Sequence, residues 1–345
     1  MGILQLSHGT LATMAAAKLA AAATASGGLF AVNKPPGISC AGLIDYVKRN
    51  AGLGDQAVPF IQHFEHEREL RVSGKKIYRR RYPTALRVGH AGTLDVEAAG
   101  VLVLGVDSGC KRLDKYLKGD KSYLATGRLG IATDSMDAEG IVTNIRDASA
   151  VTSDMVLNVL PRFIGNIEQV PPMHSAIRVD GKRLYEYVRS GEPLPAELKP
   201  RKVNISDVKL LYCRTQQQGQ AYGKRVVLPP ECVEYFTGGR FAWDEARKGS
   251  EPVVGGHMDG FVNQPSAPTV QLLVVSGGGV YIRSLINDMG ELLGCGATMA
   301  TLVRMSQGPM RLGRDTIDVN DLPYVTRIVD AMRQTQARID KDSRA

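Results

Sequence analysis

Short apolar runs bounded by glycine and proline are the dominant pattern along this chain. The run Leu29 to Val32 predicts a buried strand, and the turn at 33–37 (Asn-Lys-Pro-Pro-Gly) ends it. Leu43, Ile44 and Val47 recur at helical spacing and predict a helix from 42 to about 51. By the same criteria, further strands are expected at 101–106, 123–129 and 270–275, and further helices at 110–117, 152–164 and 280–293.

These elements are short, and strands do not alternate with helices in the regular way that a parallel sheet requires. The pattern therefore predicts an α+β fold with flanking helices, forming one domain over 29–327. Two loop insertions are expected inside this domain. One is basic and covers about 52–87, and the other, at about 214–269, is rich in Gln, Gly and Pro.

Both ends of the chain are expected to lie outside the packed domain. Residues 1–28 contain an alanine run and one lysine, but no arginine and no acidic residue. This composition predicts a disordered or loosely helical leader, and it leaves an organelle-targeting role open. The tail 328–345 is expected to be a charged helix or coil without a core of its own.

The net charge of +8 allows an anionic partner without establishing one. Residues 68–87 carry eight Lys or Arg against one Glu, with Tyr78 and Tyr82 among them. Such a segment suits an RNA backbone, with tyrosines free to stack on bases, but a solvated loop explains it equally well. No apolar stretch has the length of a membrane span, and the five scattered cysteines lack the spacing of a zinc site. We therefore expect neither membrane association nor a metal.

The densest candidate chemistry lies at 89–95, Gly-His-Ala-Gly-Thr-Leu-Asp. Two glycines allow a tight turn, which would present the imidazole of His90 and the carboxylate of Asp95 in front of a buried strand. A carboxylate held in this way can act as a nucleophile or as an acid or base. Local chemistry alone leaves a helix N-cap open as the role of Asp95.

Residues 89–102 fit the pattern Gly-His-x-Gly-x-Leu-Asp-x-x-Ala-x-Gly-Val-Leu, and in this the chain resembles the TruB-type pseudouridine synthases. Five other segments resemble motifs of the same family in the same order: the strand and Lys-Pro-x-Gly turn at 29–37, the Lys-x-Tyr strand at 121–133, Pro-Pro-x-x-Ser-Ala at 171–176, a strand start at 200–205, and Gly-x-Tyr-Ile-Arg-Ser within 276–285. The resemblance implies the pseudouridine synthase catalytic fold, with a mixed, mainly antiparallel sheet.

Catalytic roles follow from the resemblance at three matching positions. Asp95 aligns with the family's nucleophile, which attacks the target uridine. Arg283 matches the arginine that pairs with this aspartate. Tyr123 aligns with the tyrosine that stacks on the base and assists removal of the C5 proton, although its apolar neighbours alone would make it a core residue.

Three further residues are implied to bind the substrate. His90 matches a histidine that contacts the RNA and helps the flipped base into the pocket. Tyr281 matches a second aromatic residue of the base pocket, and Lys34 is expected near the active site. The alternative for Arg283 is an anion-binding turn, since the triplet Gly277-Gly278-Gly279 precedes it.

The family's reaction is an isomerisation of uridine, so no cofactor is expected. The implied substrate is the T-arm uridine of tRNA, position 55, with an mRNA stem-loop of similar shape left open. The basic insertion resembles the eukaryotic, Pus4-like branch. About 35 residues follow Pro309, too few for the PUA domain of other branches, so no obligate protein partner is expected.

An RNA chaperone of the same fold remains an alternative function, and an unrelated phosphate-binding enzyme is a third possible function. Nucleus, mitochondrion and cytoplasm all stay open as locations.

Overall fold

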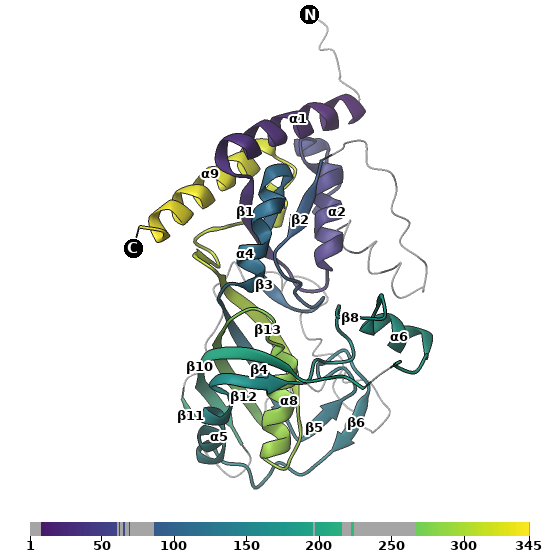
Figure 1. The fold of residues 1–345 in the computed structure, drawn as a ribbon, viewed down its shortest axis with the longest axis vertical. Helices are drawn as coiled ribbons and strands as arrows, with labels where there is room; N and C mark the ends of the chain where they lie inside the picture. Colours follow the sequence, from purple (N-terminus) through teal and green to yellow (C-terminus); the bar gives the residue numbers. More distant parts are fainter. Residues whose placement is uncertain are drawn as a thin grey trace, which may run out of the picture. The chain divides into compact units, whose positions relative to one another are not determined.

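The computed structural model describes residues 8–60, 62, 65, 69, 86–195, 197–215, 222–223 and 267–344. Most of the two predicted insertions, at 52–87 and 214–269, therefore lies outside the described residues. The described chain divides into two compact units. The first unit contains residues through Lys121 and again from Val303, and the second runs from Ser122 to Leu302. Each unit is described below by itself (Figure 1).

The sheet of the first unit is built around β3, which is buried along its whole length. β1 pairs antiparallel with one edge of β3. At the other edge of β3, β2 pairs antiparallel with its second half, and the end of β13 pairs parallel with its first residues. β15 extends the sheet parallel to β1, and β14 pairs antiparallel with β13. The strands concerned are β1 (Leu29–Lys34), β2 (Val88–His90), β3 (Ala99–Val106), β13 (Ala297–Gln307), β14 (Met310–Arg311) and β15 (Thr316–Ile317).

Helices at both ends of the chain pack onto this unit. The first and last helices, α1 and α9, lie side by side in Figure 1 and are in contact. The Arg112 guanidinium joins them by donating to the Gly27 carbonyl at 3.1 Å and to Gln336 Oε1 at 2.8 Å. The α-helices of the unit are α1 (His8–Ser26), α2 (Cys40–Asn50), α4 (Leu113–Lys118) and α9 (Val325–Asp342), and the 3-10 helices are η1 (Gly54–Gln56), η2 (Asp107–Arg112) and η5 (Val319–Asp321).

Two sequence-based expectations concern these terminal helices. The leader 1–28 was expected to be disordered or loosely helical, and α1 is a helix that buries Leu19 and Ala23 completely. The tail 328–345 was expected to be a charged helix or coil without a core of its own, and α9 is a helix whose Ile339 belongs to the hydrophobic cluster that includes Leu29 and Val101. In α1 most of the apolar residues are alanines, and in α9 the apolar residues alternate with charged ones, so the buried face of each helix shows only when the partner helix is in place.

The second unit is a mainly antiparallel sheet with short helices. Its strands follow the order β11-β10-β12-β4-β13, and β7 pairs antiparallel with the first part of β10. Two small hairpins, β5–β6 and β8–β9, complete the strands. The strands are β4 (Lys121–Leu129), β5 (Ile131–Thr133), β6 (Val142–Ile145), β7 (Gly165–Gln169), β8 (Arg178–Val179), β9 (Lys182–Arg183), β10 (Arg201–Arg214), β11 (Tyr222–Gly223) and β12 (Thr269–Ser276). The helices are α5 (Ser153–Val159), η3 (Leu160–Phe163), α6 (Leu184–Ser190) and α8 (Ile282–Leu292).

The α+β class is confirmed, with a mixed and mainly antiparallel arrangement of strands. Most predicted elements are present within a few residues, but β13 was not predicted. Its sequence, Ala-Thr-Met-Ala-Thr-Leu-Val-Arg-Met-Ser-Gln, has neither a continuous apolar run nor strict alternation, although most of it is buried. None of the described helices is both long enough and apolar enough to cross a membrane.

If α1 is an integral part of the first unit, removing its buried side chain should destabilise the protein. Leu19→Ala is expected to lower the free energy of unfolding by about 2–4 kcal/mol, the usual cost of truncating a buried leucine. The matched control is Met14→Ala, because Met14 lies on the same helix and is 59% exposed. Chemical denaturation of the full chain measures both variants. Equal effects of the two substitutions would show that α1 does not depend on this packing.

Candidate active site

The loop that carries Asp95 connects β2 to β3 in the first unit. His90 ends β2, and residues 96–97 form a turn in which the Ala98 N–H donates to the Asp95 carbonyl at 3.2 Å. Strand β3 begins at Ala99, so no helix follows Asp95, and the N-cap alternative is excluded. The Asp95 side chain is half-buried. A partly exposed carboxylate on a loop tied to a buried strand is suited to meet a substrate.

The first half of this loop is held by two buried side chains of β13. Arg304, which is 2% exposed, donates to the Gly92 carbonyl at 3.3 Å and to the Thr93 carbonyl at 3.2 Å. Gln307 is completely buried and donates to the Ala91 carbonyl. Three consecutive carbonyls of the loop thus receive hydrogen bonds from one strand.

The second half is held by Lys34 at the end of β1. Its ammonium group donates to the carbonyls of Pro35 at 2.8 Å, Val96 at 3.0 Å and Ala98 at 2.7 Å. Lys34 was predicted to bind the substrate, but it is completely buried and these three bonds match its three N–H donors. Lys34 therefore holds the backbone that directly follows Asp95, and its predicted contact with the substrate stays a prediction.

Two glycines allow Lys34 and Arg304 to approach the backbone of the loop closely. Gly92 has a φ of +92°, and Gly100 has a φ of +106°. Residues other than glycine rarely adopt these backbone angles. Gly100 of β3 pairs with Lys34 on one side and with Arg304 on the other. A Cβ atom at Gly100 would lie 2.3 Å from the Arg304 carbonyl oxygen. The glycine thus lets the two cationic side chains flank the loop.

Cys40, the first residue of α2, anchors the residue before Asp95. Its sulfur accepts the Leu94 N–H at 3.3 Å and lies 3.5 Å from the Leu94 carbonyl oxygen. Burial raises the pKa of the Cys40 thiol, while the charges of Lys34 and Arg304 act in the opposite direction. The thiol is therefore a neutral structural contact.

Burial shapes the ionisation of two further residues near the loop. Burial first, and then the charge of Arg304, lower the pKa of His90, with the Gly92 backbone partly opposing them. Burial and Arg304 also lower the pKa of Lys121 to about 8, and Asp120 partly offsets this. The Lys121 ammonium caps α4 by donating to the Leu117 and Gly119 carbonyls at 2.9 and 2.6 Å. The neutral imidazole of His90 is thus favoured over a wider pH range than that of a free histidine.

In the second unit, Arg283 joins three segments that the sequence presented as separate motifs. The side chain is 3% exposed, in the first turn of α8. Its guanidinium donates to the carbonyls of Ser135 at 3.1 Å and His174 at 3.0 Å, and it forms an ion pair with Asp137 at 3.3 Å. Asp137 also accepts the Ser135 hydroxyl at 2.6 Å. The pairing of Arg283 with Asp95 stays a prediction.

The two predicted aromatic residues also belong to this unit. Tyr123 is 6% exposed in β4, and Tyr281 is half-buried just before α8. The Gln169 side chain fixes the Tyr281 backbone by accepting its N–H at 2.8 Å and donating to its carbonyl at 2.9 Å. The Ser284 hydroxyl donates to the Val170 carbonyl at 2.8 Å, so the end of β7 holds the start of α8 in two places.

The predicted site residues therefore form two groups. His90, Asp95 and Lys34 come together in the first unit, and Tyr281 and Arg283 are neighbours in the second, which also contains Tyr123. Sequence reasoning missed the supporting residues, namely Arg304, Gln307, Cys40 and Gln169. Arg304 and Gln307 lie in a segment without a continuous apolar run or strict alternation, so the sequence carried no clear signal for them.

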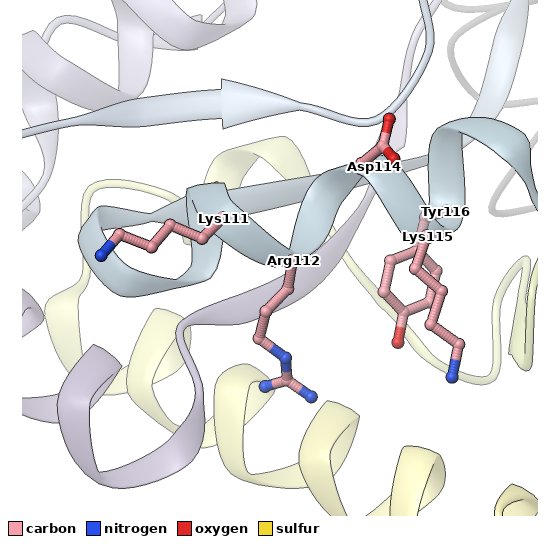
Figure 2. A pocket seen from close by; sticks show the side chains of 5 residues that line it. All are labelled: Lys111, Arg112, Asp114, Lys115 and Tyr116. Carbon is pink, nitrogen blue, oxygen red and sulfur yellow. The ribbon is translucent and has the colours of Figure 1, made fainter.

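A pocket of about 400 Å³ lies elsewhere on the first unit and contains none of the predicted site residues. It is lined by Lys111, Arg112, Asp114, Lys115 and Tyr116. Figure 2 shows Arg112, Lys115 and Tyr116 extending to one side of the helical segment and Asp114 to the other. Because Arg112 already bonds to Gly27 and Gln336, the pocket is partly a seam between packed helices. No cluster of metal-ligating side chains occurs among the described residues.

Comparison with known proteins identifies the family of this chain. Residues 75–226 match the N-terminal domain of the TruB family pseudouridylate synthases, and residues 283–339 match the tRNA pseudouridylate synthase B C-terminal domain. The human pseudouridylate synthase TRUB1 is 32% identical over 95% of this chain and 72% of its own length. The chain belongs to the TruB family of pseudouridine synthases. The second match covers most of α9, in agreement with its packing on the first unit.

Other members of the TruB family are similar over different lengths. The tRNA pseudouridine synthase 4 of Saccharomyces cerevisiae is 29% identical over 84% of this chain and 79% of its own length. The tRNA pseudouridine synthase B of Synechocystis is 38% identical, but the match covers 66% of this chain and 59% of that protein. The long human and yeast matches agree with the expected resemblance to the eukaryotic branch.

The lowered pKa of His90 predicts a pH-dependent stability. Between the ordinary histidine pKa of about 6.5 and the lower value in the folded protein, the unfolded chain binds more protons than the folded one. The free energy of unfolding should therefore fall as the pH is lowered below about 6.5, and His90→Asn should remove this part of the decrease. Urea denaturation of both proteins from pH 7 to pH 5 measures it. Parallel curves for the two proteins would contradict the lowered pKa.

Proposed function

We propose that this protein is a tRNA pseudouridine synthase that converts the T-arm uridine at position 55 into pseudouridine, with Asp95 as the nucleophile. The main support for this proposal is the family's signature loop. Its backbone is anchored before Asp95 by Arg304 and Gln307 and after Asp95 by Lys34. The chain spans 59% of the length of the Synechocystis tRNA pseudouridine synthase B that it matches.

The reaction moves one bond within the uridine. The glycosidic N1–C1′ bond breaks, a C5–C1′ bond forms, the proton on C5 leaves and N1 takes up a proton. Atoms and electrons balance without an oxidant or a reductant, so the chemistry calls for a nucleophile and a group that accepts the proton. Asp95 supplies the nucleophile, by attack on C1′ or on the pyrimidine ring.

The remaining site residues suit the steps around this bond change. The target base must leave its stack, which costs a few kcal/mol, and stacking on Tyr123 and Tyr281 offsets part of that cost. Tyr123 also assists removal of the C5 proton, and the neutral imidazole of His90 helps to place the flipped base. In this proposal Arg283 orients the Asp95 carboxylate, while its ion pair with Asp137 holds the guanidinium in place.

Transfer RNA is the proposed partner, because the names of the human, yeast and cyanobacterial relatives describe pseudouridylate or tRNA pseudouridine synthases. An mRNA stem-loop that resembles the T-arm would present the same uridine and is a second proposed substrate. We place the protein in the nucleus or the mitochondrion, with the cytoplasm as the alternative. The competing function is an RNA chaperone that binds tRNA without changing it.

Asp95→Asn should abolish the reaction while RNA binding persists. The amide is nearly isosteric but a poor nucleophile, so we expect the rate to fall by about 10³-fold or more. Pseudouridine mapping on a T-arm stem-loop measures product, and a filter-binding assay measures affinity. Asp154→Asn is the control, because Asp154 is exposed on α5. Product from Asp95→Asn would refute the nucleophile, and tight binding without product from the wild type would favour the chaperone.

The basic insertion should contribute contacts to the RNA backbone. Arg79, Arg80 and Arg81 lie outside the described residues, so this expectation rests on the sequence. Replacing all three by Ala should weaken binding and lower the slope of log K against log salt by about one for each lost phosphate contact. The single-turnover rate on bound RNA should not change. Arg333→Ala on α9 is the control, and an unchanged salt slope in the triple variant would contradict the role.

A further inference from the structure

We propose that Gln307 is a positioning residue for the reaction: its side-chain amide sets the backbone of the loop that carries His90 and Asp95. This inference rests on the proposed function. Gln307 is the last residue of β13 and is completely buried. It does not touch the carboxylate and takes no part in bond making, so it would act through the loop alone.

All four hydrogen-bonding positions of this amide are used. Nε2 donates to the Ala91 carbonyl and to the Tyr116 carbonyl, the latter at 3.3 Å. Oε1 accepts the Val103 N–H at 3.1 Å and the Arg304 guanidinium at 3.4 Å. An amide has two N–H donors and two acceptor sites, so the group is saturated. Rotating it by 180° would bring donors against donors and acceptors against acceptors, so only one orientation fits.

The four partners lie on four different segments. Val103 lies in the middle of β3, Tyr116 on α4, Arg304 three residues earlier on β13, and Ala91 in the loop. Ala91 is the critical partner because it directly follows His90. Its N–H donates to the Val103 carbonyl at 2.9 Å and its carbonyl accepts from Gln307, so both of its peptide groups are fixed.

Arg304 extends the effect of Gln307 toward Asp95. The same guanidinium nitrogen that donates to Gln307 Oε1 also donates to the Gly92 carbonyl, and the neighbouring nitrogen donates to the Thr93 carbonyl. The amide oxygen therefore helps to orient the arginine that holds the next two residues. Without it, the buried guanidinium would lose one of the contacts that set its direction, and the loop would shift upstream of Asp95.

Two substitutions separate the roles of the amide. Gln307→Met keeps the shape but removes all four bonds. Gln307→Glu keeps the acceptor oxygens for Val103 and Arg304 but replaces the donors that face the Ala91 and Tyr116 carbonyls. The matched control is Gln271→Met, because Gln271 is also a buried strand glutamine, 4% exposed, and lies on β12 of the second unit.

The test measures single-turnover conversion of a T-arm stem-loop by each variant, together with RNA affinity and melting temperature. We expect both Gln307 variants to lose about 10²-fold in rate at saturating enzyme, because small displacements of a reacting group have effects of this size. Their affinity for the RNA should stay within about threefold of wild type, whereas Gln271→Met should lower only the melting temperature.

The outcomes are distinct. A wild-type rate in Gln307→Glu, which keeps its bond to Arg304 but lacks the donors to the Ala91 and Tyr116 carbonyls, would overturn the inference. So would a rate loss in Gln271→Met equal to that in Gln307→Met, since the effect would then be general destabilisation. A wild-type protein that forms no pseudouridine would refute the proposed function itself, whatever the Gln307 variants do.

Discussion

The loop between β2 and β3 depends on one constraint: beyond the Ala91 N–H, which donates to Val103 of β3, its buried peptide groups have no regular strand pairing, yet they must be hydrogen-bonded. Side chains from neighbouring strands meet this requirement. Lys34, Arg304 and Gln307 together serve five loop carbonyls, and the sulfur of Cys40 accepts one N–H. An irregular loop can therefore be rigid, and Asp95 sits in it between two anchored stretches.

Burying two cations for this purpose is costly, and carbonyl oxygens alone repay only part of the cost. What the arrangement supplies is a fixed orientation of the loop carbonyls. A lysine reaches three carbonyls that converge from different angles, and an arginine presents a planar fork to consecutive carbonyls. Both side chains also add positive potential around the Asp95 loop, which favours an approaching phosphate backbone. Burial first, and then the charge of Arg304, lower the pKa values of His90 and Lys121.

Sequence reasoning identified the residues with distinctive chemistry and missed those that support them. Asp95, His90 and Arg283 lie in motifs with fixed spacing, so they are visible in the order of residues alone. Arg304 and Gln307 are visible only once β3 and β13 are known to be adjacent, because an arginine or glutamine on a strand is ordinarily solvent-exposed. Lys34 is an intermediate case. Its place in a motif was apparent, but its role depends on a burial that the sequence does not state.

The second unit solves a similar problem with a different device. Two of its site residues, Tyr281 and Arg283, stand at the start of α8, where the first N–H groups of a helix have no partner within the helix itself. Gln169 replaces the missing partner by bonding both the N–H and the carbonyl of Tyr281, much as an adjacent strand would. Arg283 then follows two residues later in a regular helical turn, and its bonds to Ser135 and His174 tie two loops to that turn. In each unit, then, a buried glutamine fixes the backbone and a buried arginine extends the order to the loops around it.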